Sequence, residues 1–139
     1  MPGSVMPHLI LEYSSNLESN VDIPALMTLL ADTAVGTGVF PVGGVRVRCH
    51  PSTNYRIADG HPDNMFLHLT LRIGHGRDLE KRQRAGQAVF DALVDGLASV
   101  MARKPLALSQ EIVEIDPDTT WKKGNLRDHM RARGLTVTD

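Results

Sequence analysis

The sequence has little of what marks a nucleic-acid-binding or membrane protein. Of its 139 residues only 4% are aromatic, and the formal net charge is −1. A chain this close to neutral gives no electrostatic reason to expect nucleic acid or an anionic membrane as a partner. So few aromatic side chains also argue against a base-stacking surface for RNA. No apolar run is long enough to cross a bilayer, and we expect no membrane partner.

Cysteine is nearly absent as well. The single residue Cys49 cannot form a disulfide within the chain. The N-terminus does not read as a signal peptide, and both observations predict a cytoplasmic protein. Six histidines are scattered without metal-ligand spacing to Cys49 or to a carboxylate, so we expect no metal.

Hydrophobic periodicity predicts an alternation of strands and helices in what remains, a chain of ordinary globular composition with 42% hydrophobic residues. Asp22 and Asp78 are expected to cap the two long helices, and Leu79 is counted among the inward residues of the second. Strands are expected over residues 8–13, 45–50, 65–73 and 106–115, helices over 23–36 and 79–103, a short helix after Asn125, and a short strand near 55–57.

The order strand, helix, strand occurs twice, over residues 7–50 and 65–115, and a segment 116–139 follows. This order predicts an α+β fold of two βαβ units, with a four-stranded sheet and two helices on one face. Residues 7–139 are expected to form a single domain. The other sheet face would be apolar in places, which argues for an oligomer. The same order also fits an antiparallel, ferredoxin-like module.

Two arginines are candidates for anion binding. Arg46 shares one strand face with Arg48 and His50, an arrangement that suits a carboxylate site, although a solvated strand face is the alternative. Arg77 follows two glycines at the expected start of a helix, where free N–H groups also favour anions. The alternative there is a loop arginine paired with Asp78.

The dipeptide Met6-Pro7 has the form of a start site. Residues 1–6 are interpreted as a flexible extension or a mis-assigned start. If Pro7 were the first residue, its secondary amine could carry and release a proton, and an apolar pocket would lower the pKa of that amine toward neutrality. The alternative is that Pro7 only opens an edge strand.

Four segments together, in their order and spacing, resemble the 5-carboxymethyl-2-hydroxymuconate Δ-isomerase family of the tautomerase superfamily. The resemblance extends from Met6 through the last strand. The segments are 6–12 (MPHLILE), 37–48 (TGVFPVGGVRVR), 58–60 (ADG) and 71–80 (LRIGHGRDLE).

The resemblance implies a homotrimer of subunits with two βαβ units each and no cofactor. It implies a catalytic N-terminal proline, here Pro7, and substrate-binding arginines at Arg46 and Arg77. The implied reaction is isomerisation of a small carboxylate substrate in homoprotocatechuate degradation. A different keto-acid tautomerase, of the oxalocrotonate or phenylpyruvate type, and a non-enzymatic binding trimer remain alternatives.

Overall fold

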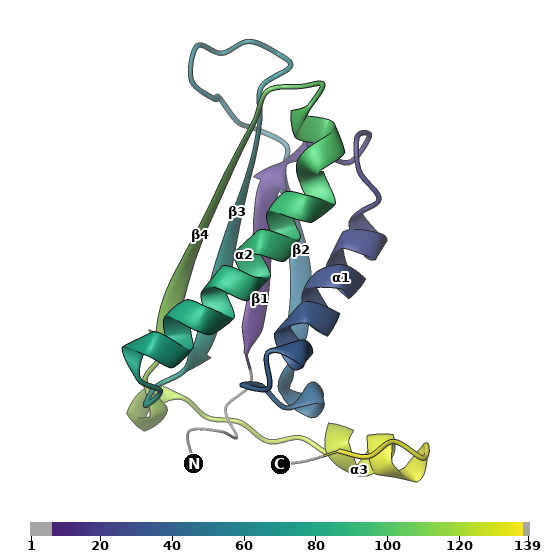
Figure 1. Cartoon of the computed structure of the whole chain (residues 1–139), viewed down its shortest axis with the longest axis vertical. Coiled ribbons are helices and arrows are strands. Elements are labelled where there is room, and N and C mark those ends of the chain that lie inside the picture. The colour runs from purple at the N-terminus through teal and green to yellow at the C-terminus, as the bar shows by residue number, and fades with distance from the viewer. Residues whose placement is uncertain (1–6, 138–139) are drawn as a thin grey trace.

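The computed structural model describes residues 7–137, in which one four-stranded sheet carries two long helices (Figure 1). The interpretation of residues 1–6 lies outside the described part. The elements are β1 (His8–Ser14), α1 (Ile23–Gly36), β2 (Arg46–Ser52), β3 (Met65–Gly74), α2 (Leu79–Met101), β4 (Leu106–Ile115) and α3 (Leu126–Ala132), with 3₁₀ turns η2 (Ser15–Leu17), η3 (Val42–Gly44) and η4 (Pro117–Thr119). The predicted long helices and four main strands are confirmed within a few residues.

The sheet has the strand order β2-β1-β3-β4. β1 pairs with β2 in parallel and β3 with β4 in parallel, whereas β1 and β3 run antiparallel. Each parallel pair is joined through a helix, as a crossover between parallel strands requires. The two predicted βαβ units are therefore confirmed, and the wholly antiparallel alternative is wrong.

Both long helices begin where the sequence predicts. The Asp22 carboxylate accepts a hydrogen bond from the backbone N–H of Ala25 at 3.0 Å, and the Asp78 carboxylate accepts one from Lys81 N–H at 2.8 Å. Each bond satisfies an N–H group that the first turn of a helix cannot pair internally. These two caps fix the points at which the chain turns back over the sheet.

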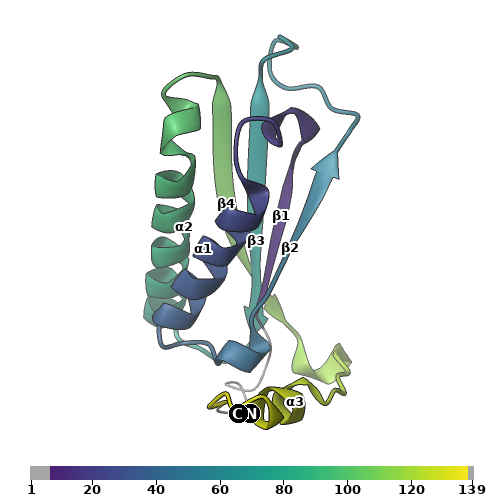
Figure 2. The ribbon, with the colours of Figure 1, turned by 90° about the vertical axis from the view of Figure 1, so that its right-hand side faces the viewer.

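Both helices cover the same face of the sheet (Figure 2). Leucines alternate along β1 and β3 with side chains of the opposite face, because successive strand residues point to opposite sides. They meet buried residues at helical spacing on α1 and α2. Residues with no exposed surface in this core are Leu9, Leu11, Leu30, Leu67, Leu69, Leu71, Val89, Leu93 and Leu97, among others.

Two local expectations are wrong. No strand forms near residues 55–57: Tyr55 is 38% exposed, and the segment folds into turns held by bonds from Gly60 N–H and Asn64 Nδ2 to the Ile57 carbonyl oxygen. Leu79 is 58% exposed and not inward. It is the first residue of α2, directly after the cap, and lies beyond the edge of the core.

The uncovered sheet face is apolar in places, as predicted, but it also carries pairs of polar and charged side chains that join neighbouring strands. Arg48 Nη1 lies 2.8 Å from His8 Nδ1 between β2 and β1, and His68 Nε2 lies 3.4 Å from Glu111 Oε2 between β3 and β4. Half-buried apolar side chains on this face are Ile10, Phe66 and Val113.

The C-terminal segment lies across one end of the sheet. Figure 1 shows α3 below the end at which β1 begins, and α3 packs against η3. The short helix is confirmed, but the Asn125 side chain makes no capping bond to it. Its Nδ2 instead lies 3.2 Å from His129 Nε2. Within residues 7–137 no helix combines the length and apolar composition that crossing a bilayer requires.

From the packing of the core we predict that truncating two leucines of α2 will change the free energy of unfolding by very different amounts. Leu93→Ala should lower the free energy of unfolding by about 2–5 kcal/mol, because it empties a closed site. Leu79→Ala, the matched control at an exposed position, should change it by no more than about 0.5 kcal/mol. Urea denaturation measures both values. An equal loss in the two variants would contradict the helix placement.

Candidate functional site

The candidate residues lie at one end of the sheet because β1 and β3 are antiparallel. His8 at the start of β1 stands opposite Arg72 near the end of β3. Pro7 therefore lies at the same end as the turn from β3 into α2 that carries Arg77. The loop after α1 and helix α3 reach this end as well (Figure 1).

Pro7 is buried at the entrance to β1. Its carbonyl oxygen accepts a hydrogen bond from Arg46 N–H at 3.0 Å, which ties it to the start of β2. A β-carbon added at Gly44 would lie 3.3 Å from Pro7 Cδ and 3.3 Å from Pro41 Cγ. Glycine thus lets the loop approach the proline ring more closely than another residue would allow.

Arg46 turns back toward the same loop. Its Nη1 donates to the carbonyl oxygens of Gly43 at 3.1 Å and Gly44 at 2.9 Å, and the residue is half-buried. This arrangement differs from a freely solvated strand face, the alternative considered from the sequence. The backbone bond to Pro7 and the side-chain bonds to the glycine pair place Arg46 beside Pro7.

Arg46 lines a cavity of about 730 Å³ between η3 and the C-terminal segment. Its charged lining consists of five basic side chains and one acidic one: Arg46, Lys122, Lys123, Arg127, Arg131 and Asp128. Such an excess of cations favours an anionic ligand. The sequence reasoning missed the C-terminal contribution, and the run of basic residues from 122 to 131 is the signal that could have found it.

Arg77 is held by the loop that follows α1. Its Nη1 donates to Gly74 O at 3.2 Å, its Nη2 donates to Val39 O at 3.4 Å, and its Cζ lies 5.2 Å from the ring centroid of Phe40. Burial lowers the pKa of the Arg77 guanidinium from its ordinary value. The turn depends on Gly76, whose φ of +115° is costly for other residues.

Arg77 and Arg46 line different hollows. Arg77 lines one of about 550 Å³ with Gly38, Lys81 and other residues near the start of α2. Arg77 does not pair with Asp78, the alternative considered from the sequence. The Asp78 carboxylate caps α2 instead. The structure brings Pro7 and Arg46 together and leaves Arg77 in a neighbouring hollow, across the loop that carries Phe40 and Pro41.

His8 follows Pro7 and belongs to the surroundings of the site. Burial, and then the charges of Arg48, Arg46 and Arg72, lower the pKa of its imidazole from the usual value. The neutral ring can accept a hydrogen bond from Arg48 Nη1 through Nδ1, at 2.8 Å. His8 thus adds no positive charge beside Pro7 near neutral pH.

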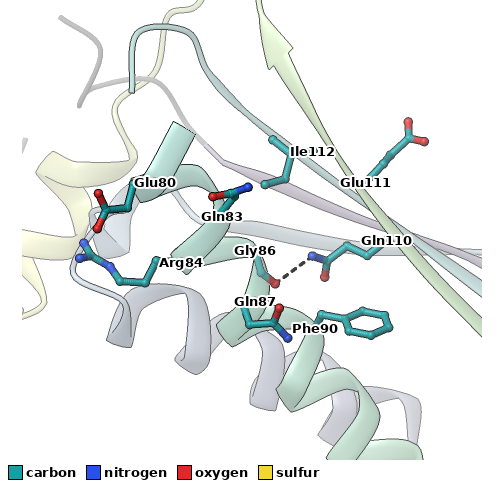
Figure 3. A pocket seen from close by; sticks show the side chains of 9 residues that line it. All are labelled: Glu80, Gln83, Arg84, Gly86, Gln87, Phe90, Gln110, Glu111 and Ile112. Carbon is teal, nitrogen blue, oxygen red and sulfur yellow. Dashed lines mark hydrogen bonds between the residues drawn. The ribbon is translucent and has the colours of Figure 1, made fainter. Parts of the chain in front are cut away.

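A further hollow, of about 870 Å³, lies between α2 and β4 (Figure 3). Across it Gln110 Nε2 donates to the Gly86 carbonyl oxygen at 2.9 Å. None of the candidate residues Pro7, Arg46 and Arg77 lines it. Among residues 7–137 no three side chains of the types His, Cys, Asp and Glu come together as metal ligands would.

Comparison with known proteins identifies the family to which the sequence is similar. The family model for 5-carboxymethyl-2-hydroxymuconate isomerase matches residues 7–130. The 5-carboxymethyl-2-hydroxymuconate Delta-isomerase of Escherichia coli is 40% identical over 121 residues, which cover 87% of this chain and 96% of the relative.

Solved structures extend the comparison to the fold. A 5-carboxymethyl-2-hydroxymuconate isomerase from Deinococcus radiodurans R1 superposes with a TM-score of 0.85 at 39% identity, covering 94% of this chain and 98% of the other. A fused 4-OT assembly described as an asymmetric trimer shares the fold at 16% identity, with a TM-score of 0.59 and coverage of 84% of this chain and 92% of the other. The chain belongs to the 5-carboxymethyl-2-hydroxymuconate isomerase family.

Proposed function

We propose that this protein isomerises 5-carboxymethyl-2-hydroxymuconate to its conjugated 2-oxo form, with Pro7 as the acid–base group. The observation that carries the proposal is the position of Pro7, buried beside Arg46, which lines a cavity whose charged residues are mostly basic. A substrate with several carboxylates matches that charge. The name of the family to which the chain belongs states this substrate.

The proposed reaction moves one proton and needs no cofactor. The Pro7 amine takes the proton of the 2-hydroxyl group, the electron pair shifts along the conjugated chain, and the same proton returns at the far carbon. This requires an unacylated nitrogen, which Pro7 has only when it is the first residue. Burial and nearby arginines disfavour a charged amine, lower its pKa and so keep it available as a base.

Arg46 and Arg77 have electrostatic roles in this proposal. Each binds a carboxylate, and together they stabilise the negative charge that spreads toward the ketone oxygen. Burial of Arg77 strengthens such an interaction, because fewer water molecules compete for its N–H groups. The protein would act in the cytoplasm, in homoprotocatechuate degradation, with residues 7–139 as one domain.

The identity of the first residue provides the principal test. A chain beginning at Pro7 should exceed an intact chain that retains residues 1–6 by roughly 100-fold or more in kcat/KM, the scale of a positioned acid–base group. Acylation leaves the Pro7 nitrogen without a usable lone pair. Mass spectrometry should confirm both N-termini before isomerisation rates are compared.

Pro7→Ala in the short form is the control for this comparison, since it retains an N-terminal amine but loses the proline ring. It should be slower than the short native form and faster than the intact long form. Equal rates in the long and short forms, with the extension proven intact, would eliminate Pro7 as the base. A binding protein without catalysis would show no turnover in any form.

Arg46→Ala and Arg77→Ala should each lower kcat/KM by about 10- to 100-fold, the value of a hydrogen bond to a charged group. Thermal unfolding should show that both variants still fold. Arg103→Ala is the matched control, because Arg103 lies beyond the far end of α2 and bonds only locally, through Nε to Ser99 O at 3.1 Å. Native kcat/KM in either test variant would remove that arginine from the site.

We also propose a homotrimer, supported by the uncovered sheet face, on which half-buried Ile10 lies in β1, one of the two inner strands. Light scattering should give three times the subunit mass. Ile10→Asp should shift the protein toward smaller species, because it buries a charge in the contact. Leu29→Asp, at an exposed position on α1, should leave the mass unchanged. A monodisperse native monomer would contradict the trimer.

A further inference from the structure

Besides Arg46, a second arginine, Arg127, lies close to Pro7, and it comes from a part of the chain outside the two βαβ units. Its side chain lies directly on the glycine pair: a β-carbon added at Gly43 would lie 2.9 Å from Arg127 Cγ. A β-carbon added at Gly44 would lie 3.5 Å from Arg127 Nη2 and 3.3 Å from Pro7 Cδ. The guanidinium and the proline ring thus approach the same glycine.

The guanidinium of Arg127 is incompletely satisfied. Its Nε and Nη2 are buried and have no hydrogen-bond partner among residues 7–137. The adjacent carboxylate of Asp128 contacts Arg131 instead, at 3.4 Å. Buried donors without partners are rare and costly, and those of a charged group especially so. An acceptor supplied by a ligand would remove this cost.

The two unpaired atoms also indicate the chemistry of that ligand. Nε and Nη2 form one edge of the planar guanidinium, with two parallel N–H groups that match the two oxygens of a carboxylate. Arg46 lines the same cavity and bonds the same glycine pair. A carboxylate in this cavity would also offset the repulsion between the two arginines.

We infer that Arg127 binds a substrate carboxylate and gives the enzyme its preference for polycarboxylate substrates. The inference rests on the proposed function for the substrate's identity. As its name states, 5-carboxymethyl-2-hydroxymuconate carries two muconate carboxylates and one carboxymethyl group. Arg46, Arg77 and Arg127 supply one cation for each of the three.

The test combines kinetics with direct binding, using the chain that begins at Pro7. Arg127→Gln should raise KM for 5-carboxymethyl-2-hydroxymuconate by about 10- to 100-fold, with a smaller change in kcat. Calorimetry at fixed ionic strength should show a similar loss of affinity for tricarballylate, a non-reacting tricarboxylate. Arg127→Lys should be intermediate, since it keeps the charge but loses the paired N–H groups.

Arg133→Gln is the matched control, because it removes an exposed cation directly after α3. It should bind tricarballylate and turn over substrate as the native chain does. Native KM and native tricarballylate affinity in a folded Arg127→Gln variant would overturn the inference. So would an equal loss in Arg133→Gln, which would indicate only a general charge effect.

The results separate this inference from the proposed function. If tricarballylate binding depends on Arg127 but 5-carboxymethyl-2-hydroxymuconate is not isomerised, the reaction is wrong and the carboxylate site remains. If isomerisation depends on Pro7 while Arg127→Gln behaves as native, only the role of Arg127 is lost. A native chain that does not bind tricarballylate also contradicts the role of Arg127.

Discussion

The structure depends on the central position of β1, which pairs in parallel with β2 and antiparallel with β3. Opposite pairing on its two sides brings the start of one βαβ unit beside the end of a strand in the other. Pro7 at the entrance to β1 therefore lies at the same end of the sheet as the turn before α2 that holds Arg77. A wholly parallel arrangement would put these residues at opposite ends.

Close packing at Gly43 and Gly44 provides the second constraint. Pro7 and Pro41 approach Gly44 from different segments, and the Arg127 side chain lies on Gly43. Any larger residue at either position would push these groups apart. The glycine pair thus lets η3 serve as a common support for a buried proline and two arginines.

Local patterns were enough to predict the elements, because a strand or helix is determined over a few residues. Period-two leucines in β3 and the caps Asp22 and Asp78 are examples. The predictions that failed concern residues whose structure depends on their tertiary neighbours. Leu79 matches the helical spacing but lies beyond the core, and Tyr55 has strand character but no partner strand. Pro7 and Arg46 were identified together through resemblance, and the fold brings them side by side.

The sequence by itself determined the order of strands and helices and the helix starts, since these follow from spacing and residue type. The three candidate residues came from its resemblance to a known family. Only the tertiary structure decided which charged groups share a cavity. Arg77 and Arg46 proved to line separate hollows, whereas Arg127 joined Arg46. The physical reason is distance along the chain: α3 meets η3 about eighty residues away, through packing that no local pattern encodes.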